Sequence, residues 1–328
     1  MRHTAYCGED MEIALDKHTS VYINTMPFGY PFNFQNYLFN QFQYLSLQEN
    51  ANRHDFFLVN HHKKRIEGRI HFFEHNEKAL SPLKALFGGF EFNHRFRIDM
   101  IDQWAWQIIQ YFREKKMKGI QIVMPAECYW PEKFENIHEV LLNYGFKVAH
   151  DALNHHIPVK EEGMFEHMHQ MEKRKLDKCR NEGLVFREEG MEQFDEVWQH
   201  LIHFRKEKDI PVSIGRDGLK KAIATFPANY RLFTVRHLHD IYAVSVAVRV
   251  NREILYNFLP ASSLAHQTLS PSVMLYDGLY DYARKNGYEM LDLGISTKPN
   301  GEHQEGLIAF KEHLGGIPSR KYTYFLEL

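Results

Sequence analysis

The hydrophobic pattern of the chain centres on the stretch from Ser270 to Gly294. Apolar residues at helical spacing predict an amphipathic helix there, and residues 290–293 form a short apolar run typical of a buried central strand. Ser270 is a candidate N-cap, followed by Pro271 at the first helical position, and Gly287 is a natural left-handed stop. A helix entered from a loop after a strand offers free N–H groups to an anionic ligand.

The first half of the chain predicts an ordered series of elements. After an aromatic-rich segment with a predicted helix over 36–47, the pattern predicts strands over 56–60 and 65–74, a helix over 99–117 ended by Gly119, a strand over 120–124, a helix over 134–143 ended by Gly145, and an extended segment over 146–159.

The second half repeats this order. A charged helix over 164–182 is followed by a helix over 192–206, strands over 230–236, 241–250 and 254–259, the central helix and strand, a helix over 307–314 and a closing strand over 321–328. Gly119 then corresponds to Gly287, and Gly145 to Gly315. Two copies of one strand–strand–strand–helix–strand–helix–strand unit predict an α/β fold with mixed sheets, divided into domains 1–163 and 164–328. The alternative is two unrelated segments whose order agrees by chance.

Composition narrows the class of protein. The chain of 328 residues has 44% hydrophobic and 25% charged residues, which is ordinary for a globular protein. Its three cysteines have no paired spacing, so neither a disulfide framework nor a zinc site is predicted. No apolar run approaches the roughly 18 residues of a membrane helix, and the N-terminus has no apolar signal core. We therefore expect a cytoplasmic protein without a membrane partner, and its net charge of −2 gives no global attraction to nucleic acid.

Several segments together carry a resemblance to a known family. They are MEKRKLDKCRNEGLVFRE, LSPSVMLYDGLYDYARKNG, YEMLDLG and GLIAFKEHLGG in the second half, and ALFGGFEFN in the first. In these segments the chain resembles tandem acyltransferase-like proteins related to the FemA/FemB/FemX peptidyltransferases, whose two halves each have the GNAT (N-acetyltransferase) fold. The resemblance covers most of residues 55–328 and implies two tandem GNAT domains and acyl transfer.

The expected donor site departs from the typical acetyltransferase pattern. The acetyl-CoA loop Gln/Arg-x-x-Gly-x-Gly/Ala is missing, because the segment between Leu259 and Ser270, PASSLAHQTL, has no glycine. The FemX-like relatives share this gap and resemble enzymes that take an aminoacyl group from tRNA. The resemblance therefore leaves two donors, acyl-CoA and aminoacyl-tRNA. The helix N-terminus with Ser270 and Ser272 is expected to contact the donor, although Ser270 also fits a purely structural cap.

The resemblance also implies the catalytic groups. Phe310 and Lys311 would contact the activated acyl end, with the ring stacking and the ammonium polarising the carbonyl. The plain alternative is that Phe310 belongs to the core and Lys311 is a solvated helix lysine. On the two strands that would border the cleft, Tyr256 is a candidate acid for the leaving group, Asn257 a candidate ligand of the donor, and Asp292 a candidate for orienting the amine. Each also fits a structural role.

The remaining charged residues do not identify the general base, nor whether the protein binds nucleic acid. A basic run at 173–180 predicts either a nucleic-acid contact or a solvated helix face. The 21 histidines include close pairs such as His155-His156, but none fits a metal-ligand motif, so they are interpreted as surface residues and no metal is expected. Either His303 or His313 could be the base.

The sequence thus predicts an enzyme that transfers an acyl or aminoacyl group to an amine of a small molecule, sugar or peptide. The second half would carry the donor site. The alternative is a non-catalytic protein with a decayed GNAT fold that holds an amine or peptide ligand. The acceptor and the oligomeric state stay open.

Overall fold

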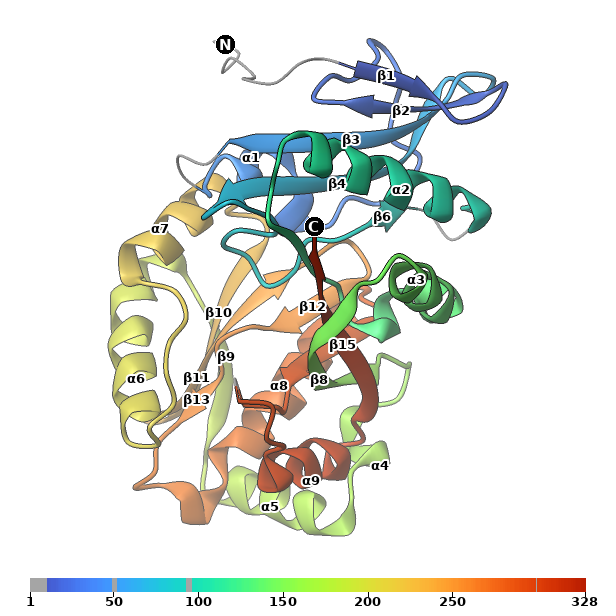
Figure 1. Ribbon diagram of the computed structural model, residues 1–328. Helices are drawn as coiled ribbons and strands as arrows, with labels where there is room; N and C mark the ends of the chain where they lie inside the picture. The colour runs from blue at the N-terminus through green and yellow to red at the C-terminus, as the bar shows by residue number, and fades with distance from the viewer. Residues whose placement is uncertain (1–10, 49–51, 93–95, 299) are drawn as a thin grey trace. The chain divides into compact units, whose positions relative to one another are not determined.

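The computed structural model describes residues 11–48, 52–92, 96–298 and 300–328. The chain forms two compact units (Figure 1): unit 1 comprises Met1–Ala152 with Arg320–Leu328, and unit 2 comprises Leu153–Ser319. The mixed α/β architecture predicted from the sequence is confirmed. None of the described helices is long and apolar enough to cross a membrane.

Unit 1 is a mixed sheet with helices packed on one face. Its strands lie in the order β1 (Met11–Ala14), β2 (Thr19–Ile23), β3 (Arg53–Asn60), β4 (Arg65–His75), β5 (Lys78–Ser81), β7 (Gly119–Val123) and β15 (Ile317–Glu327), and β6 (Glu91–Phe92) pairs with β4. Helices α2 (Asp99–Glu114) and α3 (Pro131–Asn143) supply Trp104, Phe112 and Phe134 to a core shared with Phe56 and Phe72 of the sheet. Burial of these apolar side chains is the main stabilising term.

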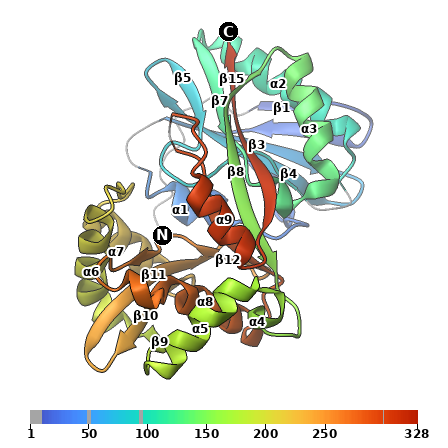
Figure 2. The same ribbon diagram turned by 90° about the horizontal axis from the view of Figure 1, so that it is seen from below.

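Unit 2 repeats this plan. Its strands lie in the order β9 (Val185–Glu189), β10 (Tyr230–His237), β11 (Asp240–Arg249), β12 (Ile254–Asn257), β14 (Met290–Ile295) and β8 (Lys147–Pro158), and β13 (Ala261–Ser262) pairs with β11. Its helices are α4 (Met164–His167), α5 (Gln170–Asn181), α6 (Phe194–Lys206), α7 (Arg216–Thr225), α8 (Pro271–Lys285) and α9 (Glu305–His313). Helix α8 packs with α5 against the core, as Figure 2 shows.

The last strand of each copy of the repeat pairs with a strand of the other unit. Residues 154–158 of β8 pair with β14, and residues 323–327 of β15 pair with β7. The chain therefore crosses between the units within β8 and β15. The predicted domain boundary at residue 163 stays a prediction, while the compact units divide inside β8 and β15.

The central elements were predicted well, and several others were not. Helix α8 begins after Ser270 and is followed by Gly287 at φ +71°, as expected. Gly119 does not end the preceding helix in unit 1: the left-handed residue is Lys116, at φ +57°, and Gly119 begins β7. The predicted helix over 36–47 is only a 3₁₀ turn (Leu38–Asn40) and the short α1 (Phe42–Leu45). The charged helix over 164–182 is broken into α4 and α5, and α7 was not predicted.

The Gly-Gly segment of unit 1 hydrogen-bonds to a side chain of the same unit. Of ALFGGFEFN, residues 85–92 are described, and the Gly89 N–H donates to Ser81 Oγ at 3.0 Å. A Cβ at Gly88 would lie 2.6 Å from that same hydroxyl. The segment therefore packs against β5 instead of presenting its N–H groups to a ligand.

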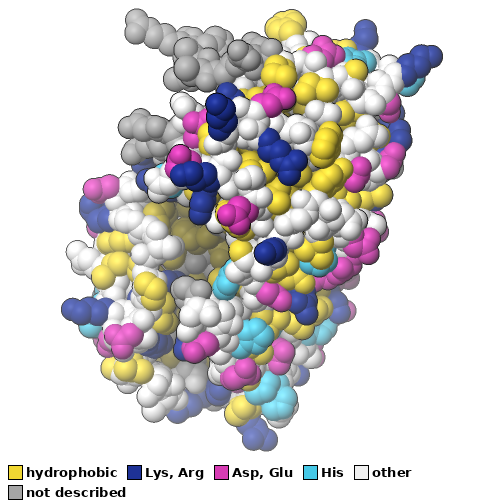
Figure 3. Space-filling model, viewed as in Figure 1, with side chains coloured by type: hydrophobic (Ala, Val, Ile, Leu, Met, Phe, Trp, Pro, Cys, Tyr) yellow, Lys and Arg dark blue, Asp and Glu magenta, His cyan; other side chains and the backbone are white. Residues whose placement is uncertain are grey.

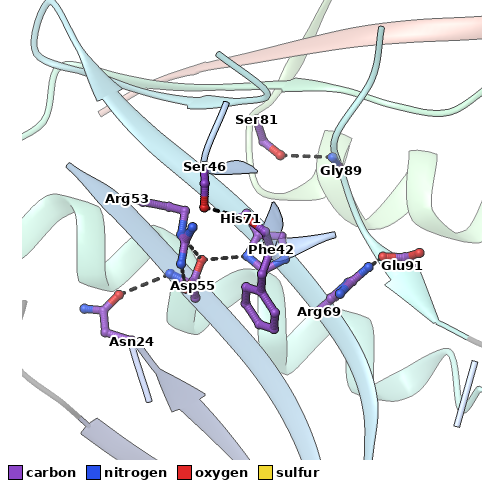
Figure 4. Close-up of polar contacts among 10 residues, drawn as sticks. All are labelled: Asn24, Phe42, Ser46, Arg53, Asp55, Arg69, His71, Ser81, Gly89 and Glu91. Atoms are coloured by element: carbon purple, nitrogen blue, oxygen red, sulfur yellow. Dashed lines mark hydrogen bonds and ion pairs between the residues drawn. The ribbon is translucent and has the colours of Figure 1, made fainter. Parts of the chain in front are cut away.

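A buried layer of charged residues lies on the face of β3 and β4 that points away from α2 (Figure 4). Arg69 Nε donates to Glu91 Oε2 at 2.6 Å, and both side chains are 1% exposed. His71 Nδ1 lies 2.7 Å from Asp55 Oδ1. Phe32 and Phe34 cover the Arg69 guanidinium, and the Tyr37 N–H donates to Glu91. The charged pairs thus fix the aromatic segment onto the sheet.

Breaking the Arg69–Glu91 pair should cost more than breaking an exposed pair. Arg69→Met leaves the Glu91 carboxylate buried without its cation, so we expect a loss of about 3 to 5 kcal/mol in the free energy of unfolding, measured by urea denaturation. The double variant Arg69→Met/Glu91→Gln should recover part of this loss. Arg97→Met, which removes an exposed partner of Asp99, is the control and should change the free energy of unfolding far less. Equal losses in the two single variants would contradict the prediction.

Candidate functional site

Two central strands of unit 2 part after a short parallel pairing. The register of β12 and β14 joins Ile254 to Met290, Leu255 to Leu291 and Tyr256 to Asp292, and the pairing ends there. Strand β14 continues against β8, with an irregularity between Asp292 and Gly294. The carbonyls of β14 beyond Asp292 are therefore available to side chains on the β12 side.

Lys311 donates hydrogen bonds to two of these carbonyls. It lies on α9 and is 2% exposed, so it is not the solvated helix lysine of the plain alternative. Its Nζ donates to Gly294 O at 2.6 Å and to Ile295 O at 3.0 Å. Burial lowers the pKa of Lys311 from the ordinary 10.5 to about 7, although the Asp292 carboxylate acts in the opposite direction.

Asp292 is held in place by polar contacts within unit 2. Its Oδ1 accepts hydrogen bonds from the Gly294 N–H at 2.8 Å and from Asn154 Nδ2 at 3.1 Å, and the side chain is nearly inaccessible. The first contact spans the irregularity in β14 and stabilises it. Asp292 therefore shapes the carbonyl pair that binds Lys311, besides placing a negative charge near its amine.

Tyr256 lies beside Gly294, one of the two residues whose carbonyls bind Lys311. A Cβ at Gly294 would be 3.0 Å from the Tyr256 hydroxyl, and Gly294 has φ +75°, so a glycine is needed at this position for two reasons. Burial raises the pKa of Tyr256, and the charge of Asp292 raises it further. The phenol consequently stays protonated and can donate a hydrogen bond or a proton.

A second buried tyrosine, Tyr276 of α8, connects Phe310 and Asn257 to the site. The Phe310 ring packs edge-on against Tyr276, with centroids 5.5 Å apart. Burial raises the pKa of Tyr276 to about 12, whereas a hydrogen bond from Asn257 opposes the rise. Asn257 Oδ1 also accepts from Ser245 Oγ at 2.6 Å. Phe310 and Asn257 thus lie near Tyr276, a residue that the sequence did not single out, and Asn257 follows Tyr256 on β12. The roles assigned to these residues stay predictions.

His155 was wrongly interpreted as a surface histidine. It is fully buried on β8 opposite Gly294, and its Nδ1 lies 3.2 Å from Ser296 Oγ. Burial, together with the charges of Lys311 and His156, lowers its pKa to about 4, so the imidazole is neutral beside the lysine. The only sequence signal was its place in a strand that pairs with the Asp292 strand, and that pairing could not be known beforehand.

The serines at the N-terminus of α8 have different surroundings. Ser270 occupies the N-cap position at φ +53°, but its hydroxyl does not cap the helix and contacts Gln267 O at 3.4 Å. Ser272 Oγ donates to Ser262 Oγ at 2.8 Å, and Lys208 Nζ donates to the same Ser262 hydroxyl at 2.8 Å. A lysine and two hydroxyls therefore lie at the start of the helix in place of a glycine-rich loop.

The basic run on α5 is partly neutralised within unit 2. Lys175 pairs with Glu172, Lys178 donates to Thr268 O, and Arg180 pairs with Asp277. On the face drawn in Figure 3, basic and acidic side chains are interspersed. These contacts favour the solvated-face interpretation of residues 173–180. Within the described chain, the histidine, cysteine and acidic side chains form no cluster that could hold a metal ion.

Only unit 2 carries the titratable groups of the site. The third pair of the parallel strands is Tyr256 with Asp292 in unit 2 and Leu80 with Gln121 in unit 1. Lys311 lies four residues before the helix-ending Gly315, and the residue four before Gly145 is Leu141, which is fully buried. In unit 1 the three equivalent positions therefore hold no group that could transfer a proton near neutral pH.

Comparison with known proteins gives a family match inside unit 2. Residues 168–305 match the family model of the acetyltransferase (GNAT) domain. Among solved structures, the chain is similar to FemX, with a TM-score of 0.68 and 12% identity over 90% of this chain and 93% of that one. It is also similar to a conserved protein of unknown function from Bacteroides thetaiotaomicron VPI-5482, with a TM-score of 0.57 and 12% identity over 89% and 92% of the chains.

A third similar structure is the C-terminal domain of a candidate lysylphosphatidylglycerol synthetase from Agrobacterium fabrum, with a TM-score of 0.54 and 14% identity over 79% and 80% of the chains. The search of curated proteins gives no match. The matched region identifies a GNAT-type domain within unit 2, and the similar structures show the fold of the chain. The chain has the two-unit fold of FemX, so the predicted relationship to FemAB-like proteins is confirmed at the level of the fold.

Substituting Gly294 should measure how closely Tyr256 approaches the backbone. Gly294→Ala introduces both a left-handed alanine and the contact with the Tyr256 hydroxyl, so we expect a loss of about 2 kcal/mol in the free energy of unfolding. Gly287→Ala is the matched control, because Gly287 has φ +71° with open space around it, and it should cost only about 1 kcal/mol. Indistinguishable losses in urea denaturation would show that the contact is unimportant.

The lowered pKa of Lys311 predicts a pH-dependent stability. Between about pH 7 and 10.5 the unfolded chain binds a proton at Lys311 that the native protein does not, so the native state gains stability as the pH rises. Relative to Lys311→Met, the wild type should gain up to about 1.4 kcal/mol per pH unit in this window and show no such trend below pH 7. Urea unfolding at pH 6, 8 and 9.5 measures the difference, and a constant difference would contradict the lowered pKa.

Proposed function

We propose that the protein is an N-acyltransferase that transfers an acyl or aminoacyl group from an activated donor directly to an amine, at the point where β12 and β14 part. The observation that carries this proposal is the buried Lys311 amine, held by the Gly294 and Ile295 carbonyls with a pKa of about 7. The matched GNAT domain supports acyl transfer in general.

The geometry of the Lys311 amine suits proton transfer. Two of its protons are donated to the two carbonyls, so its remaining tetrahedral position is an N–H in the ammonium and a lone pair in the neutral amine. A pKa of about 7 populates both forms near neutral pH. Lys311 can therefore accept the one proton that a neutral acceptor amine loses when it attacks, in addition to the carbonyl-polarising role that the resemblance implies.

The proposed step balances as follows. The acceptor nitrogen attacks the acyl carbon and forms the C–N bond, while its proton passes to Lys311. The bond from the acyl carbon to the leaving oxygen or sulfur then breaks, and Tyr256 donates its proton to that atom. Asp292 keeps the carbonyl pair in place and favours the protonated lysine. Phe310 and Asn257 border the acyl group, and Ser270 and Ser272 lie at the end of α8 that would face an anionic donor.

Two observations favour an oxygen ester, such as aminoacyl-tRNA, over a thioester, such as acyl-CoA. The raised pKa of Tyr256 makes it a poor acid for a thiolate but a suitable one for a strongly basic alkoxide. The segment between β12 and α8 also contains no glycine that would let its backbone approach a pyrophosphate. The GNAT fold in general uses acyl-CoA, so both donors belong in the test.

The test is a screen of acyl-CoA and aminoacyl-tRNA donors against pooled amines, with products identified by mass. For the active pair, Lys311→Met should lower kcat/KM by on the order of 100-fold or more, because a general base contributes roughly that much. The wild-type kcat/KM should rise with pH and level off above about pH 7, since the neutral amine is the active form.

The pH profile of kcat/KM should be measured with two acceptors whose amines differ in pKa. This distinguishes the titration of Lys311 from the titration of the acceptor. The break in the profile that belongs to Lys311 should stay in place with both acceptors, whereas one caused by the acceptor should move. Lys311→Arg, which stays charged, should lack the break. If Lys311→Met retains full activity, or if no donor and amine react, the alternative of a ligand-binding protein with a decayed GNAT fold is favoured.

A further inference from the structure

Arg205 is a largely buried cation without an acidic partner. It lies in the last turn of α6, where Nη1 donates to Pro211 O at 3.0 Å and Nη2 to Pro260 O at 3.3 Å. Its Nε is buried and has no hydrogen-bond partner. Over the described ranges of the chain, no carboxylate forms an ion pair with it, and the groups that act on its charge are two tyrosines.

Other buried arginines of the same chain have acidic partners. Arg69 is paired with Glu91, and Arg236 of β10 contacts both Glu189 and Glu196 at 2.7 Å. Burying a charge without a partner is costly, and burial accordingly lowers the pKa of Arg205. Two backbone carbonyls compensate only part of that cost. An unpaired guanidinium is therefore expected where a ligand supplies the missing charge.

The two tyrosines place Arg205 at the proposed reaction centre. Its charge opposes the rise in the pKa values of Tyr256 and Tyr276, whose side chains border the acyl site. A second cation follows at Lys208, whose Nζ binds Ser262. The neighbouring Glu207 carboxylate accepts from the Leu264 N–H at 3.0 Å and also attracts the Lys208 ammonium, so it offsets part of this charge. Arg205 itself has no carboxylate partner among the described residues.

We propose that Arg205 binds an anionic group of the acceptor, so that the acceptor is an amine with a carboxylate or phosphate close to its nitrogen. The proposal rests on the proposed acyl transfer and names its substrate class. A carboxylate fits because Nε and the free N–H of Nη2 form the fork that a planar anion accepts in two parallel hydrogen bonds. Arg205 donates to the carbonyl of Pro260, three residues after Asn257, so the anion and the amine would be near neighbours, as in an amino acid.

The first test compares acceptors that differ only in charge. An amino acid, its primary amide and the corresponding decarboxylated amine form one series, and an aminoalkyl phosphate with its alcohol forms the other, so the two sources of the anion are distinguished. The wild type should prefer the anionic member of at least one series. Arg205→Gln should lower kcat/KM for that member by roughly 10- to 100-fold and change the neutral members by less than about threefold.

The second test needs no turnover. Arg205→Gln removes an unpaired buried charge, so its melting temperature should equal or exceed that of the wild type, whereas Arg236→Gln, which breaks a paired charge, should lower it. Millimolar amino acid or aminoalkyl phosphate, without donor, should raise the melting temperature of the wild type and not that of Arg205→Gln.

Three outcomes would overturn the proposal: equal use of charged and neutral amines by the wild type, an equal loss for all acceptors in Arg205→Gln, or a lowered melting temperature of Arg205→Gln with an unchanged response to the anions. Absence of acyl transfer to any amine would instead refute the proposed function. In that case the melting experiment still reports whether Arg205 binds the anion.

Discussion

The hydrogen bonds from Lys311 to the carbonyls of Gly294 and Ile295 depend on how briefly β12 and β14 pair. After the Tyr256–Asp292 pair the two strands part, and β14 is left with carbonyls that β12 does not use. A buried backbone carbonyl without a partner costs free energy, and so does a buried lysine. Each compensates for the other. The Lys311 charge adds to burial in keeping His155 neutral, and the glycine at position 294 leaves room for the Tyr256 hydroxyl.

The two copies of the repeat share one backbone arrangement but differ in the side chains at equivalent positions. Both parallel pairs begin four residues after a helix C-cap, and both following helices end at a glycine with φ near +90°. In unit 1 the interior positions are apolar or amide, and its buried charges are matched in pairs on the opposite face of the sheet. In unit 2 the corresponding interior carries tyrosine, aspartate and lysine. The side chains proposed to transfer protons therefore lie in unit 2, at positions where unit 1 has Leu80, Gln121 and Leu141.

The sequence predicted those features that local patterns determine. Pro271 and Gly287 set the limits of α8, the apolar run 290–293 identified β14, and the resemblance drew attention to Lys311. It could not predict the features that arise from pairing across long distances. His155 looked like a surface residue because nothing local places it opposite Gly294, and the exchange of β8 and β15 between the copies leaves no local pattern. Gly119 was misassigned because Lys116 adopts the left-handed conformation that glycine normally takes.

The distribution of buried charge explains why no local pattern reveals the partners of Lys311 and Arg205. In a stable core each buried cation has a carboxylate within hydrogen-bond distance, as Arg69 and Arg236 do, and periodicity then predicts the element correctly. Lys311 and Arg205 are instead satisfied by backbone carbonyls, which any sequence provides and no pattern reveals. Their burial reduces the stability of unit 2, and such a cost persists in a protein when it improves function. Lys311 binds the carbonyl of Gly294 and Arg205 that of Pro260, so the cost falls near the ends of β14 and β12, where an acyl carbon and an anionic acceptor would have to meet.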